Sequence, residues 1–421
     1  MAHSIKQCFH AVGKGTLYTG QIKNMSGNST FNIVYDCGST SRTTIINKIH
    51  SLPKWFKNTH DSRVIDMLVI SHFDDDHVNG LEELLRLYRV KKLILPYTEW
   101  TQSVREIAVL GKKGVSPSVA LFQLNPLRWL QMNNLNGSVE QLTLVQGNYP
   151  PDDNHEEPNS PPRYPPNADF NNLNFQNNER EAIQQVNLFG EEGAFFKFKS
   201  SGNQTGPVIR TIDHAVPLYS TGSVYEFMFY NVVKPFKGLG LVRVQSGEIC
   251  AVKSGVPLKD VKAEIELIID SLGLTNDISS LPPDWRKKLK ACYQKHFGHT
   301  AKAKNNISLC MYVGRRINSI IDLMTQHATL LTGDINLTRD VACDMLDHFG
   351  TRRKKSISVV QVPHHGSRDY WSAGNASLFV PAIFVQCVTP SKNHPHPDVT
   401  LDIEKTGCTV QYANRISEYN F

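Results

Sequence analysis

The chain has 421 residues, of which 40% are hydrophobic and 20% are charged, and its formal net charge is +6. This composition is ordinary for a water-soluble globular protein and excludes the disordered and fibrous classes. No apolar run approaches the roughly 20 residues that a membrane span needs, and the first residues lack the apolar core of a secretory signal. We therefore expect a cytoplasmic protein with no membrane partner.

The cysteines indicate a reducing environment. The chain has eight of them, with no CxxC pair, and several lie in apolar runs. This pattern is more typical of reduced core residues than of a disulfide framework.

The N-terminal third alternates strand-like and helix-like segments. Residues 31–39 and 64–71 are β-rich runs, residues 80–90 carry apolar side chains at helical spacing, and residues 91–96 form another strand pattern. This rhythm predicts a layered α/β domain.

The middle of the chain changes character. Residues 148–180 are rich in Asn and Pro and poor in aliphatic side chains, which predicts a mobile loop rather than a domain. Helical patterns at 259–272 and 285–297 indicate a helical insertion at 255–303, so we interpret residues 1–421 as a single domain with insertions.

The segment SHFDDDHVNG, at positions 71–80, crowds acid and imidazole groups directly after a predicted strand. The side chains of His72 and Asp74, two residues apart, can point the same way. The adjacent side chains of Asp76 and His77 can lie on either side of a second point. A divalent cation would relieve the repulsion among the carboxylates. The alternative is a solvated acidic turn that caps a helix near Val78, and Asp75 suits such a local role. The candidate ligands for a pair of metal ions are His72, Asp74, Asp76 and His77.

Polar residues follow several other predicted strands. Taken singly, a histidine pair is more often a core or surface pair than a ligand site, and a Gly-Asp after a strand is commonly a turn. Their joint occurrence in one chain favours one shared site. These residues are Asp36, Asp334, His364, His365, Ser367, His394 and His396.

The order of the motifs resembles the metallo-β-lactamase superfamily. More narrowly, it is similar to the soluble hydrolase domain of the ComEC family of competence proteins and to its free-standing relatives. The resemblance implies a four-layer αββα sandwich, with a metal site at one edge of two facing sheets. It skips the middle of the chain. The motifs that carry it are HAVGKG, YDCGS, SHFDDDHVNG, NNISLCMYV, LLTGDI, VPHHGS and SKNHPHPDV.

The resemblance also implies a ligand set. His72 with Asp74 would hold one ion, and Asp76 with His77 the other. Asp334 would bridge both ions. His364 or His365 would close the site.

This sequence departs from the family's usual pattern at two ligands. Asp74 replaces a histidine, and Asn305 and Asn306 stand near the place of another. The resulting donor set is richer in oxygen, which tilts the expected cofactor from Zn²⁺ toward Mn²⁺ without excluding Zn²⁺.

The implied chemistry is hydrolysis by a hydroxide that bridges two divalent ions, with Asp76 and Asp334 in the catalytic centre. His394 could protonate the leaving oxygen or position a phosphate, and His396 is a second candidate for substrate contact. Asp36 is expected to orient a ligand histidine without touching metal. Two further candidates for substrate contact, whose alternative is ordinary turn hydrogen bonding, are Asn305 and Ser367.

These inferences favour a metal-dependent phosphodiesterase that acts on DNA or RNA as a nuclease. The basic excess is too small to argue for a polyanionic partner by itself. One alternative is hydrolysis of a small molecule, such as a cyclic nucleotide, a phosphocholine-type ester, a lactone or a thioester. Another is a catalytically silent, metal-binding regulatory protein.

Overall fold

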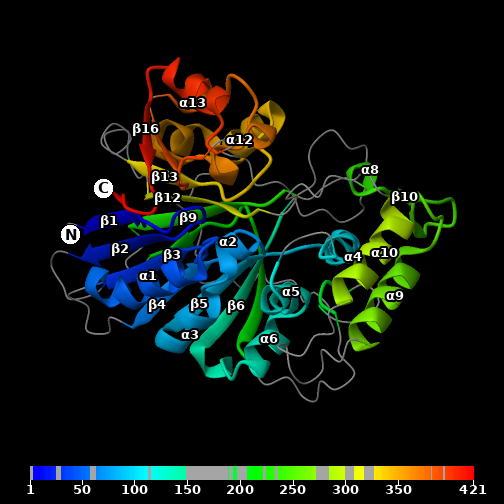
Figure 1. Ribbon diagram of the computed structural model, residues 1–421. Helices are drawn as coiled ribbons and strands as arrows, with labels where there is room; N and C mark the ends of the chain where they lie inside the picture. The colour runs from blue at the N-terminus through cyan, green and yellow to red at the C-terminus, as the bar shows by residue number, and fades with distance from the viewer. Residues whose placement is uncertain are drawn as a thin grey trace, which may run out of the picture.

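Two β-sheets lie face to face in the computed structural model of the chain (Figure 1). The structure describes residues 3–24, 30–56, 63–111, 115–147, 188, 193–196, 206–220, 224–232, 236–271, 284–298, 308–316, 327–380, 382–391 and 394–421. The loop expected at 148–180 lies outside these ranges, as does Asn305.

The first sheet is antiparallel at one side and parallel from β3 to β7. Because parallel strands end on the same side, their carboxyl ends form one edge. In spatial order its strands are β17 (Tyr419–Asn420), β1 (His3–Phe9), β2 (Tyr18–Asn24), β3 (Thr30–Tyr35), β4 (Val64–Val69), β5 (Arg89–Pro96), β6 (Val139–Gln146) and β7 (Val208–Asp213).

The second sheet is parallel from β13 to β16 and antiparallel at its other side. Its order is β16 (Thr409–Tyr412), β15 (Ile383–Gln386), β14 (Ile357–Gln361), β13 (Ala328–Leu331), β12 (Cys310–Arg315), β9 (Tyr225–Tyr230) and β8 (Leu218–Tyr219). A separate small sheet pairs β10 (Leu241–Arg243) with β11 (Ile249–Ala251).

Helices cover the outer face of each sheet (Figure 1). On the first sheet and beside it lie α1 (Arg42–Trp55), α2 (Asp75–Val78), α3 (Leu81–Leu87), α4 (Trp100–Val109), α5 (Pro117–Leu124), α6 (Pro126–Met132), α8 (Phe236–Leu239), α9 (Leu258–Ser271) and α10 (Trp285–Phe297). On the second lie α12 (Arg339–Ser356) and α13 (Pro397–Glu404), with the 3₁₀ turns η5 (Pro363–Gly366), η6 (Arg368–Tyr370) and η7 (Asn375–Phe379). The 3₁₀ turn η1 (Asn136–Ser138) precedes β6.

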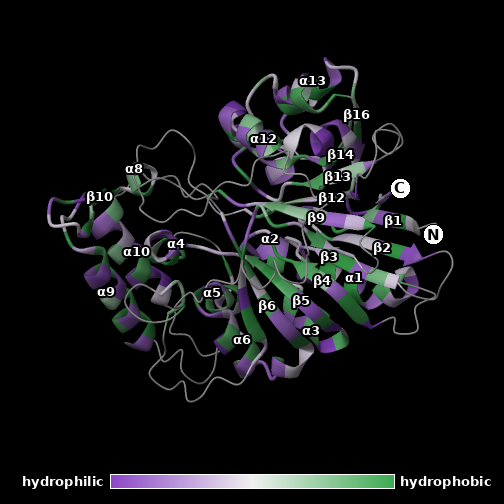
Figure 2. Cartoon of the chain, turned by 180° about the vertical axis from the view of Figure 1, so that it is seen from behind, coloured by the Kyte–Doolittle hydropathy of each residue, from purple (hydrophilic) through white to green (hydrophobic). Residues whose placement is uncertain are grey.

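The alternation of buried side chains explains the layers. In β9, Phe227 and Phe229 point into the core between the sheets, whereas Met228 and Tyr230 point into the core beneath α12. Successive side chains of a strand face opposite sides, so a strand that is apolar throughout requires cover on both. The strands of both sheets are largely hydrophobic in Figure 2, while α9, α12 and α13 carry hydrophilic residues as well. The four-layer α/β sandwich predicted from the sequence is confirmed.

The helices expected at 259–272 and 285–297 are α9 and α10. In α9, Leu258, Val261, Ile265 and Ile269 repeat at helical spacing and are buried. This stripe joins the core that also contains residues of α4 and α10, which shows how the insertion packs on the first sheet's side of the molecule.

The other predicted elements are present with shifted ends. The helix expected at 80–90 ends at Leu87 because Tyr88 is already extended, and β5 begins at Arg89. All eight cysteines are free thiols. No helix in the described ranges is both long and apolar enough to cross a bilayer.

A pair of leucine variants tests the core between the sheets. Leu331 is fully buried there, whereas Leu401 on α13 is 50% exposed. We expect Leu331→Ala to lower the free energy of unfolding by about 2–5 kcal/mol, because it removes buried methyl groups and leaves a cavity. Leu401→Ala should change it by less than about 1 kcal/mol. Denaturant titration measures both, and equal losses would contradict the assigned core.

Candidate metal centre

Loops from both sheets bring the candidate residues to one edge. Each loop follows the carboxyl end of a parallel strand, which is where open α/β sheets place their sites. After β3 comes Asp36, after β4 His72, after β13 Asp334, after β14 His364 and His365, and after β15 His394.

The loop after β4 leads directly into the short helix α2. Asp75 accepts hydrogen bonds from the Ser116 amide (3.0 Å) and hydroxyl (3.1 Å), so it anchors the loop to the start of α5. Asp74 stands at the N-cap position, but its side chain does not cap the helix and lies 3.8 Å from His72 Nε2. The acidic turn therefore combines a local structural role with a row of side chains turned toward the site.

One group of donors surrounds Asp334 Oδ2. His364 Nδ1 lies 3.0 Å from this oxygen, and His72 Nε2 lies 3.6 Å from it. With Asp74 next to His72, this group contains two imidazoles and two carboxylates.

A second group surrounds the other oxygen of the same carboxylate. His77 Nε2 lies 3.1 Å from Asp334 Oδ1, and His365 Nε2 lies 3.2 Å from Asp76 Oδ2. One ligand atom from each of Asp76, His77 and His365 lies within 4.8 Å of the other two. Asp334 thus stands between the two groups and presents one oxygen to each.

Hydrogen bonds on the far side of the rings fix their orientation. Asp36 Oδ2 accepts from His77 Nδ1 (2.8 Å), and Asp36 Oδ1 accepts from the Ser71 amide (2.7 Å). The Ser71 hydroxyl lies 2.9 Å from His72 Nδ1, and the Cys387 carbonyl accepts from His365 Nδ1 (2.8 Å). Such bonds select the tautomer whose Nε2 is available to a metal.

The electrostatics of the site reflect four carboxylates beside four imidazoles. Burial, followed by the charge on His77, lowers the pKa of His72 to about 4. Burial also opposes charge on His77, but Asp334 and Asp36 outweigh it and raise the pKa of His77 well above its usual value. Burial likewise opposes charge on Asp334, yet the surrounding imidazoles hold the pKa of that carboxyl well below its usual range.

The donor set fits divalent metal ions. His77 Nε2 and His364 Nδ1 are buried and form no hydrogen bond within the described structure, although each lies close to an Asp334 oxygen. Leaving buried polar atoms unsatisfied is costly. Imidazole nitrogens and carboxylate oxygens that converge on one place are the arrangement expected around cations.

The backbone at the site adopts uncommon conformations. His364 (φ 47°) and His365 (φ 56°) both lie in the left-handed region, which non-glycine residues seldom adopt. This turn sends two consecutive rings to different sides of Asp334. At Gly38, a Cβ would lie 2.2 Å from the His77 amide nitrogen, so only glycine lets the loop after β3 approach α2 so closely.

Two residues that hydrogen-bond the turn carrying Asp334 were not predicted from the sequence. The Ser308 hydroxyl accepts from the Asp334 amide (2.9 Å), and Gln361 Oε1 accepts from the Thr332 amide (3.1 Å). Both hold the turn that carries Asp334. Each lies in an apolar run, Ser308 within the NNISLCMYV motif, and acts on backbone amides of the turn, so residue type alone does not reveal its role.

The remaining candidates lie near the site but do not join either group. The His394 ring is 6.2 Å from the His364 ring, at the edge of the site. His396 Nδ1 accepts from the Asp398 amide (3.2 Å) and caps α13. Ser367 is half-buried and follows the histidine turn, and Tyr370 stacks on the His364 ring at 3.9 Å.

Comparisons with known proteins show only distant likeness. No protein-family model matches the chain, and no curated protein matches it. The metallo-beta-lactamase fold protein YhfI from Bacillus subtilis is 9% identical, with 99% of each chain covered and a TM-score of 0.35. Unliganded yeast PDE1 is 8% identical, with 98% of each chain covered and a TM-score of 0.36.

Two glycine variants test the packing beneath His77. Gly38→Ala should destabilise the protein by about 1–3 kcal/mol and weaken metal binding, because the added methyl group pushes against the His77 backbone. Gly137→Ala is the matched control, since a Cβ there meets nothing within 4 Å. Thermal unfolding and metal titration measure both effects. The close approach of these loops is refuted should the two variants behave alike.

Proposed function

We propose that the chain is a metal-dependent hydrolase that cleaves phosphodiesters, with nucleic acid as the leading substrate class, and that two divalent ions act at the strand-end site. The observation that carries the proposal is the position of Asp334, which has His72 and His364 near one carboxylate oxygen and His77 near the other. A carboxylate in that position can bridge two cations.

The proposal assigns both histidines of the VPHHGS turn as ligands, one to each ion. The first ion would be held by His72, Asp74, His364 and Asp334 Oδ2, and the second by Asp76, His77, His365 and Asp334 Oδ1. In this assignment His364 would supply the imidazole in place of the family histidine near whose position Asn305 and Asn306 stand. Each ion then has an equal mixture of nitrogen and oxygen donors, which suits Zn²⁺ and Mn²⁺ alike.

When bound, two such ions lower the pKa of a shared water and neutralise charge on the group under attack. The chain itself would orient the ligand side chains and exclude bulk water from them. Asp36 fixes the His77 ring, the Cys387 carbonyl fixes the His365 ring, and burial excludes bulk water from His72 and His77. His394, which is half-buried beside His364, would give a proton to a leaving oxygen.

Nucleic acid is the leading substrate because the motif order resembles a hydrolase domain of DNA-uptake proteins and the chain is basic overall. A second candidate is a small phosphodiester. In the basic run at 352–355, Arg353 is buried and paired with Glu226, so only Arg352, Lys354 and Lys355 are exposed to a polyanion.

Metal content and hydrolysis test the ligand assignment. Asp334→Ala should lose both ions and reduce hydrolysis of bis-nitrophenyl phosphate at least about 100-fold, because within the described part of the chain no other carboxylate lies between the two groups of ligands. His364→Ala and His365→Ala should each lose one ion. His50→Ala is the control, because His50 lies on α1 with its side chain 53% exposed and paired with Glu83. Full metal content in Asp334→Ala, measured by elemental analysis, would refute the assignment.

A substrate panel separates the two candidate functions. With Mn²⁺ or Zn²⁺ present, we expect cleavage of single-stranded or double-stranded DNA, or of RNA, and gel electrophoresis detects it. Turnover of the chromogenic ester alone would favour the small-molecule hydrolase. Binding of both ions without turnover of any substrate would contradict the enzymatic proposal and favour a regulatory protein.

A further inference from the structure

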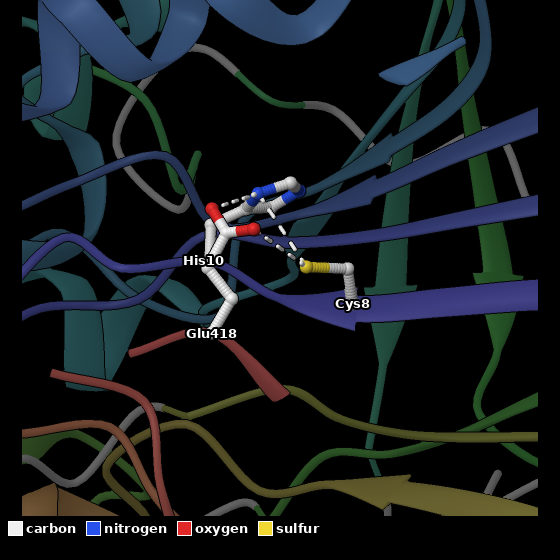
Figure 3. A group of neighbouring side chains, drawn as sticks. All are labelled: Cys8, His10 and Glu418. Carbon is white, nitrogen blue, oxygen red and sulfur yellow. Dashed lines mark hydrogen bonds and ion pairs between the residues drawn. The ribbon is translucent and has the colours of Figure 1, made fainter. Parts of the chain in front are cut away.

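A second cluster of metal-ligating side chains lies where the two ends of the chain meet. Cys8 in β1 and His10 just after it are buried, and Glu418 just before β17 reaches them from the C-terminal end (Figure 3). One ligand atom from each of the three residues lies within 4.8 Å of the other two. None of the three belongs to the site around Asp334.

Strand register explains why these residues meet. Cys8 and His10 are two residues apart, so their side chains lie on the same face of the strand. β1 pairs antiparallel with β17, with Cys8 opposite Asn420 and Phe9 opposite Tyr419. The next pair in this register places Glu418 opposite His10, on the same face as both ligand candidates. Figure 3 shows the sulfur, the ring and the carboxylate turned toward one another.

The distances match those between the ligands of a zinc ion. Bonds of about 2.3 Å to sulfur and about 2.0 Å to nitrogen and oxygen, at tetrahedral angles, put sulfur about 3.5 Å from each other donor and nitrogen about 3.3 Å from oxygen. Here Cys8 Sγ lies 3.5 Å from His10 Nδ1, and His10 Nδ1 lies 3.3 Å from Glu418 Oε1. Cys8 Sγ lies 4.0 Å from Glu418 Oε2, and a small rotation of this partly exposed carboxylate shortens that distance.

The other ring nitrogen of His10 is already engaged. His10 Nε2 lies 2.7 Å from the Thr19 hydroxyl, and the Trp55 ring packs edge-on against the imidazole. Such a partner is what orients a ligand histidine. It also excludes a Cys-His-Glu catalytic triad. In a triad the nucleophile and the acid face opposite ring nitrogens, whereas here both Cys8 and Glu418 face Nδ1.

We propose that Cys8, His10 and Glu418 form a mononuclear site for Zn²⁺, separate from the hydrolytic centre. A thiolate, an imidazole and a carboxylate are a donor set that suits zinc and is too soft for Mg²⁺ or Ca²⁺. The ion replaces the thiol proton and leaves one coordination position for water. Glu418 also lines an open depression of about 680 Å³, which gives the ion a path from solvent.

Lys48 also contacts the Glu418 carboxylate. Its Nζ lies 2.5 Å from Glu418 Oε1, the same oxygen that faces His10. Zinc must displace this ammonium group, so Lys48 and zinc compete for Glu418. If the three residues served only as an ion-pair network, removing Lys48 would have no effect on metal affinity.

Cobalt substitution of the full-length protein tests the thiolate ligand. A thiolate bound to Co²⁺ gives a charge-transfer absorption band, which the thiol-free site around Asp334 does not. Glu264, Cys292 and His296 form another group of possible ligands that contains a thiol. The experiment therefore starts from Cys292→Ala, which removes that thiol. We expect the Cys292→Ala variant to show the band with Co²⁺. The band should remain when Asp334→Ala is added to this variant, and it should disappear when Cys8→Ala is added instead. No band in the starting variant, or a band that survives Cys8→Ala, overturns the proposal.

Two conservative variants test the site without touching the buried core. Glu418→Gln should weaken Zn²⁺ binding at the thiolate site at least about 10-fold, by competition with a chromophoric chelator, since even a residue that only orients a ligand has an effect of that size. Lys48→Met should tighten it. Zinc should raise the melting temperature of the wild type more than that of Glu418→Gln, because a bound ion ties the two ends of the chain together. Unchanged zinc affinity in Glu418→Gln overturns the proposal even if Cys8→Ala fails to fold.

Discussion

The candidate centre depends on the contacts between the buried Asp334 carboxylate and the imidazoles around it. This carboxylate is buried at the seam between the two sheets, with one oxygen toward His77 and the other toward His72 and His364. A buried carboxylate needs compensation for its charge. The imidazoles supply part of this compensation, and the proposed cations would supply the rest. The two facing sheets bring strand ends from both halves of the chain to this one carboxylate.

Much of this arrangement could be predicted from the sequence, because the strands are recognisable as apolar runs and the candidate ligands follow them directly. The loop from His72 to His77 is a single dense motif, and Asp334 and the His364–His365 pair each end a clear strand pattern. Since parallel strands end at a common edge, convergence follows once the layered fold is recognised. The four-layer order is implied by the resemblance of the motifs to the metallo-β-lactamase superfamily, and strands that are apolar on both faces are consistent with it because both faces must be covered.

Other parts could not be read from the sequence. The two histidines of the VPHHGS turn diverge only because both adopt left-handed backbone conformations, and residue identity does not reveal that. Ser308 and Gln361 act through backbone amides of another segment, so their contributions depend on tertiary contacts. Cys8, His10 and Glu418 come together through pairing of strands from opposite ends of the chain, a contact between residues more than 400 positions apart. His10 lies within the HAVGKG motif, but nothing local connects it to a carboxylate so distant.

Anomalous X-ray scattering from crystals grown with Zn²⁺ or Mn²⁺ tests the central claim most directly. The account predicts two peaks about 3.5–4 Å apart, one near His72 and His364 and the other near His77 and His365, with the Asp334 carboxylate between them. A single peak, or a pair of peaks that both lie away from Asp334, would contradict it.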